Sequence, residues 1–260
     1  MSTNRTKRAD AYFICATPRT GSSLLLGLLE STGIAGRPEA YFREPDELLW
    51  ADRWGLPPTD DGRVKYGDYV RAALAAGRTD NGVFGAKLMW GTLDEVVEKL
   101  AAVYPDDAGP GADLTLLTRA FGQIRFVHLR REDAVAQAVS WLRAEQTGTW
   151  YIGDSTPGAD AEEARFDAAG IQTYAECIAQ HNAAWEQWFS SFAIEPFVVH
   201  YEGVCADLVG VTRGVLDFLQ LDLPAGRDIV ARHQRQRDEL SDQWIERFKA
   251  EHASLPRGLA

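Results

Sequence analysis

The feature that most constrains this chain is an apolar run, a short polar loop and a leucine-rich run close to its start. Residues 12–16 (YFICA) have the apolar, aromatic character of a buried strand, and residues 22–31 (SSLLLGLLES) repeat leucine at helical spacing. Between them, Gly21 allows a tight turn, and Arg19 adds a permanent positive charge. Because a helix start offers unpaired N–H groups and a positive dipole end, this unit predicts an anion site. A plain helix-capping turn is the alternative.

The loop Thr17-Pro18-Arg19-Thr20-Gly21-Ser22-Ser23 differs from the nucleotide loop of kinases and ATPases. It lacks the Gly-Lys-[Ser/Thr] triplet that binds phosphates and magnesium, so a P-loop kinase is disfavoured. The five histidines are scattered, and the three cysteines (15, 177 and 205) lie far apart in apolar stretches. We therefore predict no metal site and three reduced, buried thiols.

Apolar runs alternate with helical patterns along the rest of the chain. The predicted strands are residues 12–16, 83–88, 125–129 and 196–201, and the predicted helices are residues 22–31, 92–103, 133–143, 171–192 and 208–219. This alternation predicts an α/β fold with a P-loop-type parallel sheet flanked by helices. We expect one domain over residues 1–260, with residues 153–164 (GDSTPGADAEEA) as a surface loop or lid.

The overall charge limits the partners. The formal net charge is -11, from 27 Lys+Arg and 38 Asp+Glu, and this argues against broad nucleic-acid binding. The first ten residues lack the apolar core of a signal peptide, and no apolar run is long enough for a membrane span. The expectation is a cytoplasmic protein without a membrane span.

A second basic element ends a predicted strand. Arg130 and Arg131 precede a helix that carries Ser140, and a strand-end arginine with a helix serine could clamp a phosphate. The alternative is a solvated strand end paired with Glu132 and Asp133. Together with the first loop, this element indicates a nucleotide that has two separate anionic ends.

The predicted helix over residues 171–192 carries an apolar stripe that includes its tryptophans, which we interpret as core. His181 falls on this stripe, and Asn182 lies beside it. A hydrogen-bonded core histidine and a group near a substrate are both open interpretations.

The combination resembles the sulfotransferases that depend on 3′-phosphoadenosine 5′-phosphosulfate (PAPS), most closely the trehalose 2-sulfotransferase-like family. The stretches that carry the resemblance are TPRTGSSLL (17–25), TGIAGRPE (32–39), FGAKLMWG (84–91), LRREDAVAQAVSWLRAEQTGTW (129–150), HNAAWEQWF (181–189), VVHYEGV (198–204) and ELSDQWIERF (239–248). They span nearly the whole chain and are specific in combination.

The resemblance implies a sulfotransferase fold, a homodimer and in-line transfer of a sulfuryl group from PAPS, with 3′,5′-adenosine bisphosphate (PAP) as the product. The residues that it implies for the 5′-phosphosulfate are Arg19, Thr20, Gly21, Ser22 and Ser23, and those for the 3′-phosphate are Arg130 and Ser140, with Arg131 as a neighbour. The acceptor that it implies is a hydroxyl of a sugar, and catalysis would consist largely of positioning and of charge stabilisation by Arg19.

The chain departs from the family pattern in one segment. The family has its general-base glutamate at the fifth position of Gly-x-Pro-x-Glu-aromatic-Phe, and residues 36–42 (GRPEAYF) place Ala40 there. Since a methyl group cannot accept a proton, Glu39, Glu44 or His181 would serve as the base, or turnover is weakened. A PAPS- or PAP-binding module that has lost catalysis is therefore the alternative function.

The acceptor itself is not encoded in a recognisable motif. The segment around Ala40 would face it, and the aromatic side chains that could stack on a sugar are Tyr41, Phe42, Trp90 and Trp150. Each of the four could equally belong to the core.

Overall fold

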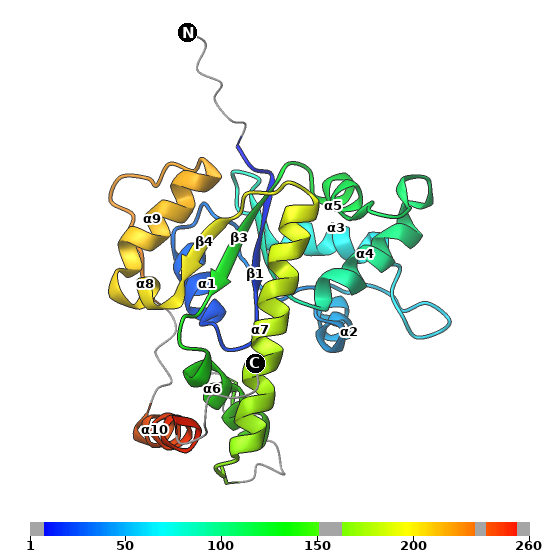
Figure 1. Ribbon diagram of the computed structural model, residues 1–260. Helices are drawn as coiled ribbons and strands as arrows, with labels where there is room; N and C mark the ends of the chain where they lie inside the picture. The colour runs from blue at the N-terminus through cyan, green and yellow to red at the C-terminus, as the bar shows by residue number, and fades with distance from the viewer. Residues whose placement is uncertain (1–7, 151–162, 232–237, 254–260) are drawn as a thin grey trace.

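The structure, a computed structural model, describes residues 8–150, 163–231 and 238–253 (Figure 1). Its sheet consists of β1 (Ala11–Ala16), β2 (Phe84–Met89), β3 (Ile124–Arg130) and β4 (Phe197–His200), all parallel, in the order β2-β1-β3-β4. The predicted parallel α/β sheet is confirmed. Residues 153–162 of the predicted lid lie outside the described residues.

Helices connect the strands. They are α1 (Ser22–Ser31), α2 (Glu44–Arg53), α3 (Tyr66–Gly77), α4 (Thr92–Val103), α5 (Asp113–Phe121), α6 (Ala134–Thr147), α7 (Ala168–Ser191), α8 (Tyr201–Ala206), α9 (Leu208–Leu219) and α10 (Glu239–Ala253), with a 3₁₀ turn over Pro105–Asp107. The predicted strands and helices agree with these bounds within four residues. The sequence patterns did not predict α2, α3, α5, α8 and α10; in α2, Leu48 and Leu49 are exposed, which weakens its amphipathic pattern.

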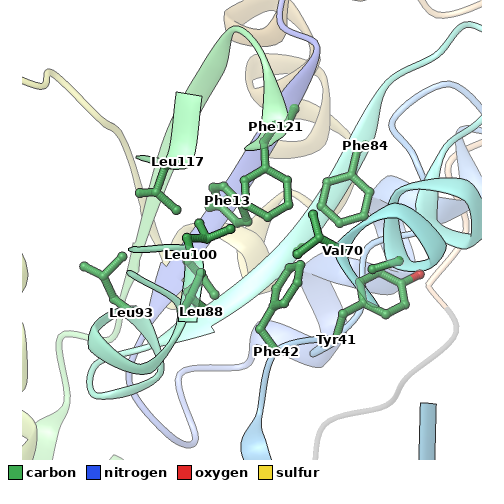
Figure 2. Packing of buried hydrophobic residues seen from close by; sticks show 14 of the residues in the cluster. Phe13, Tyr41, Phe42, Val70, Phe84, Leu88, Leu93, Leu100, Leu117 and Phe121 are labelled. Carbon is green, nitrogen blue, oxygen red and sulfur yellow. The ribbon is translucent and has the colours of Figure 1, made fainter. Parts of the chain in front are cut away.

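Side chains that alternate along β1 build a core on each face of the sheet. On one face, Phe13 packs with Phe84, Phe121 and other apolar residues beneath α2–α5 and α7 (Figure 2). On the other face, Tyr12 and Ile14 pack with the leucines of α1 and with α8 and α9. Trp185 of α7 is fully buried in the first core, so its interpretation as a core residue is confirmed.

The carboxyl ends of the strands are covered by α6 and α10, which lie beyond the sheet at the lower end of the molecule in Figure 1. A third apolar cluster joins α6, α7 and α10 and contains Val139, Leu142, Ile178 and Trp244. The loop after β1 therefore opens toward a region that α6 and α7 enclose.

The predictions of buried cysteines and of no membrane span can be compared with the structure. All three cysteines are free; Cys15 is buried as predicted, whereas Cys177 and Cys205 are only half-buried. None of the described helices combines the length and the apolar character that a bilayer crossing requires.

Candidate functional site

The loop between β1 and α1 has the backbone of an anion site. Arg19 and Gly21 both take left-handed conformations, with φ of 64° and 81°. The buried Thr20 hydroxyl donates to the Thr17 carbonyl at 2.9 Å and so holds the turn closed. Among the residues that the structure describes, no side chain caps the start of α1 at Ser22. The N–H groups and the positive dipole end of this helix are therefore directed at the space beside the loop.

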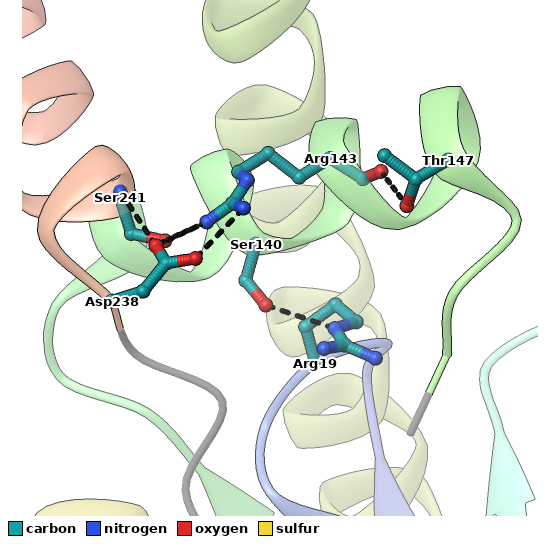
Figure 3. A network of polar contacts seen from close by, with 6 residues as sticks. All are labelled: Arg19, Ser140, Arg143, Thr147, Asp238 and Ser241. Carbon is teal, nitrogen blue, oxygen red and sulfur yellow. Dashed lines mark hydrogen bonds and ion pairs between the residues drawn. The ribbon is translucent and has the colours of Figure 1, made fainter. Parts of the chain in front are cut away.

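A hydrogen bond joins Arg19 to α6, more than a hundred residues further along the chain. Its Nε donates to Ser140 Oγ at 2.9 Å, as Figure 3 shows, and its Nη1 donates to the Trp150 carbonyl at 2.5 Å. Arg131 Nη1 donates to the Arg19 carbonyl at 3.2 Å. The structure thus brings together Arg19, Arg131 and Ser140, three of the residues that the sequence predicted for one nucleotide.

Gln137 belongs to the same arrangement, although the sequence analysis did not select it. Its Nε2 donates to Thr17 Oγ1 at 2.8 Å and to the Pro18 carbonyl at 2.7 Å, and the side chain is fully buried. Within the described part of the chain, its Oε1 has no hydrogen-bond partner. The available signal was its position one helical turn before Ser140, on the same face of α6.

Tyr201 closes the loop from the other side. A Cβ atom at position 21 would overlap its ring, so only glycine fits where the loop meets this side chain. The Arg131 guanidinium lies over the same ring, 4.8 Å from its centroid. The predicted glycine is thus required both by its left-handed backbone and by a close neighbour.

Arg130 lies at the end of β3 and is directed toward α7. Its Nη1 forms an ion pair with Glu186 Oε1 at 2.5 Å. For Arg130, the structure thus shows a pairing with Glu186 in place of the alternative pairing with Glu132 and Asp133, whereas Arg131 is among the charges that lower the pKa of Asp133. The Asp133 carboxylate accepts the Ala136 N–H at 2.9 Å, and so caps α6.

The segment that contains Ala40 runs beside β2. The Glu39 carbonyl accepts the Lys87 N–H at 2.9 Å, and Glu39 pairs with Ala86 in a parallel bridge. Glu39 is exposed and Ala40 is half-buried. This backbone pairing places residues 39 and 40 at the edge of the sheet.

The next two residues of this segment turn inward. Tyr41 and Phe42 are buried among the aromatic rings of the core, and the Tyr41 hydroxyl donates to the Arg37 carbonyl at 2.6 Å (Figure 2). The fully buried Phe42 presents no face to a ligand in this structure. Of the four aromatic candidates, Trp90 and Trp150 are half-buried, and Trp150 is the one that contacts Arg19.

α7 brings His181 and Asn182 to the end of β1. The Trp185 Nε1 donates to the Ala16 carbonyl at 3.1 Å, and His181 lies one helical turn before it. His181 Nε2 lies 3.5 Å from Cys177 Sγ, and burial lowers the pKa of the imidazole. His181 Nδ1 and Asn182 Oδ1 are buried without a partner among the described residues. The helix thus offers an imidazole and an amide near the loop.

Glu44, the third candidate base, is positioned differently. It is the first residue of α2, is exposed, and its carboxylate lies 3.7 Å from the Lys99 ammonium.

Lys87, a half-buried lysine inside β2, was not predicted from the sequence. Its signal was a single charged residue within the apolar run FGAKLM.

Comparisons with known proteins identify the family and the relatives of this chain. The model of the family described as Stf0 sulphotransferase matches residues 11–251. A Mycobacterium tuberculosis protein named Trehalose 2-sulfotransferase is 31% identical and covers 94% of this chain and 96% of its own length. A Mycolicibacterium smegmatis protein of the same name is 32% identical and covers 95% and 97%. A solved sulfotransferase from Alicyclobacillus acidocaldarius has 15% identity and a TM-score of 0.47, and covers 95% and 93%.

Proposed function

The chain belongs to the Stf0 sulphotransferase family, and from this premise we propose that it transfers a sulfuryl group from PAPS to a hydroxyl of a carbohydrate or a glycosylated small molecule. The observation that carries the proposal is the bond between Arg19 and Ser140, which ties the anion loop to α6. A trehalose-like acceptor is included because two similar proteins are named for trehalose. PAPS supplies the activated sulfuryl group.

We define the donor side as the loop over residues 17–23 with Arg130, Arg131, Gln137 and Ser140. The loop amides and Arg19 would bind the 5′-phosphosulfate, because the uncapped start of α1 favours negative charge there. Ser140 Oγ accepts a bond from Arg19 and keeps its own hydrogen for a phosphate oxygen. Arg130 would exchange Glu186 for the 3′-phosphate at little cost, since such a partly exposed ion pair is worth about 0–1 kcal/mol.

We define the acceptor side as residues 36–42 with His181, Asn182, Trp90 and Trp150.

In the transfer, the acceptor oxygen bonds to sulfur while the bond from sulfur to the phosphate oxygen breaks. The electron pair of that bond stays on the phosphate, and the acceptor proton passes to a base. We assign Glu39 this role because it is exposed and adjacent to the missing position, with His181 as the second candidate.

A binding module that has lost catalysis is the second candidate function. The observation in its favour is Ala40, which leaves the family's base position without a proton acceptor. The donor side does not depend on that residue, so nucleotide binding would survive the loss.

Two measurements test the proposal. We expect PAP to raise the melting temperature of the protein, and we expect magnesium to make no difference. Stabilisation by ATP that requires magnesium would instead support a kinase.

Turnover is tested by mass spectrometry of a sugar panel incubated with PAPS. We expect an acceptor-dependent gain of one SO3 unit, and a larger gain with Ala40→Glu. If both proteins bind PAP and neither modifies any sugar, the binding-module function is supported instead.

The remaining parts of the proposal concern the whole protein. We propose a single domain over residues 1–260 that acts in the cytoplasm as a homodimer and binds neither nucleic acid nor a metal. The support is the family match over residues 11–251 and the net charge of -11. Light scattering of the purified protein tests the dimer, and a monomeric mass would contradict it.

A further inference from the structure

Lys87 occupies an unusual position for a lysine, in the middle of a paired strand. It pairs with Ile14 of β1, and on its other side its N–H donates to the Glu39 carbonyl. Phe84, Ala86 and Leu88 of β2 point into the aromatic core. Because side chains alternate along a strand, the Lys87 side chain points to the opposite face, which α1 covers.

The ammonium group of Lys87 is held differently from that of another half-buried lysine. Within the described residues, no hydrogen bond or ion pair reaches it, although the side chain is half-buried. Lys99 is also half-buried, but its Nζ lies 2.8 Å from Glu47 Oε2 and 3.7 Å from Glu44 Oε1. Taking an ammonium out of water is costly when nothing compensates its charge. An unpaired cation at such a place therefore indicates a site for an anion that arrives from outside.

Arg19 of the donor side and Glu39 of the acceptor side are among the charges that act on Lys87. Burial lowers the pKa of its ammonium, and so do the charges of Arg43 and Arg19, while Glu39 and Asp46 raise it. The side chain thus lies within electrostatic reach of the loop arginine and of the candidate base. Lys87 pairs with β1, which leads into the loop of the donor side, and its N–H donates to Glu39 of the acceptor side, so it lies between the two sides.

We propose that Lys87 is a further catalytic residue, whose ammonium binds the sulfuryl oxygens during transfer, opposite Arg19. The proposal rests on the proposed function. The sulfuryl group keeps its negative charge on its peripheral oxygens while the bond to the phosphate breaks and the bond to the acceptor forms. Charge-assisted hydrogen bonds from two sides stabilise that charge at the moment of transfer. Lys87 accepts no proton in this step, because the proton of the acceptor hydroxyl passes to the base.

The test compares the affinities for PAPS and PAP, because only PAPS carries the sulfuryl group. In Lys87→Met, calorimetry should show an affinity for PAPS that is about tenfold lower, whereas that for PAP changes by less than about twofold. With any acceptor that the wild type modifies, kcat should fall by about 10²–10³-fold. Lys87→Arg should recover part of both losses, since it restores a positive donor.

A control and a stability measurement separate this role from a structural one. The exposed Lys65→Met should match the wild type in every assay. The melting temperature of Lys87→Met should equal or exceed that of the wild type, because the variant removes an unpaired buried charge. Equal losses for PAPS and PAP, or a PAPS affinity that does not change, would overturn the role of Lys87 and leave the proposed function standing. A wild type that binds neither nucleotide would overturn the proposed function itself.

Discussion

The donor side and the acceptor side of this molecule are built in different ways. On the donor side, side chains that are distant in sequence hold one another, as Arg19 does with Ser140 and Gln137 with Thr17. On the acceptor side, residues 36–42 are held by backbone pairing with β2 and by the burial of Tyr41 and Phe42. A substitution on the donor side therefore disrupts a network, whereas position 40 can change without disturbing the fold.

This difference explains how an alanine can stand at position 40, where the resemblance to the family implies a glutamate base. Neither the bridge between Glu39 and Ala86 nor the core around Phe42 uses the side chain of residue 40. On the acceptor side, the residue proposed for the chemistry can therefore change without a change in the fold. On the donor side, the same groups that are proposed to bind the nucleotide also connect the loop to α6.

The largest effect is expected from Arg19→Met. Because Arg19 joins the loop to α6 and would stabilise the developing charge, kcat/KM should fall by about 10³-fold. Transfer from radiolabelled PAPS to the best sugar of the panel measures it. The exposed Arg119→Met is the matched control and should retain full activity. A fall of less than about tenfold would show that the donor side does not depend on this network.

Glu39→Gln tests which residue of the acceptor side takes the proton. If Glu39 takes the proton, kcat should fall by about 10²-fold while the affinity for PAP is unchanged. His181→Gln should cost less than about tenfold. Its pKa is lowered by burial, so a role as base would make the wild-type rate fall only in acid, below the ordinary histidine value. A larger loss in His181→Gln, together with the disappearance of that acid limb, would transfer the role to His181.

Two glycine substitutions test whether each side has the function assigned to it. Gly36→Ala would bring a methyl group to 2.8 Å from the Gly85 nitrogen, and Gly21→Ala would drive one into the Tyr201 ring. Both glycines have positive φ, so each substitution should cost about 1–3 kcal/mol of stability. Only Gly21→Ala should also weaken PAP binding, by about tenfold in calorimetry. Equal PAP affinities in the two variants would contradict the assignment.

The smallest effect is expected where α10 docks on α6. Arg143 binds Asp238 through both carboxylate oxygens and also contacts Ser241 (Figure 3). These bonds hold the pKa of Asp238 well below its usual range, so their stabilisation is present at neutral pH and is lost as the pH falls below about 4. Because Asp238 is half-exposed, Asp238→Asn should lower the melting temperature by only about 2–4 °C at pH 7.

The pH dependence is the check on this prediction. Thermal unfolding at pH 3 should show a smaller difference between Asp238→Asn and the wild type than at pH 7. A difference that stays constant with pH would mean that the ion pair contributes little.

The sequence patterns predicted the four strands and five of the ten helices of the described residues. The strands and helices that were predicted agree with the structure within four residues, because burial on one face imposes their periodicity. α2 was missed because Leu48 and Leu49 face solvent. Gln137 and Lys87 were missed because a polar residue within an apolar run has no local feature that shows which group it faces.

By itself, the sequence determined the strand, loop and helix of the proposed anion site, because each follows from residues that are neighbours along the chain. It also determined that position 40 lacks a proton acceptor. Only the tertiary structure decided that Ser140 and Gln137 hold the loop, that Tyr41 and Phe42 are core, and that Lys87 lies between Ile14 of β1 and Glu39. The physical reason is that such contacts join residues far apart in sequence, and only the packing of the helices on the sheet brings them together.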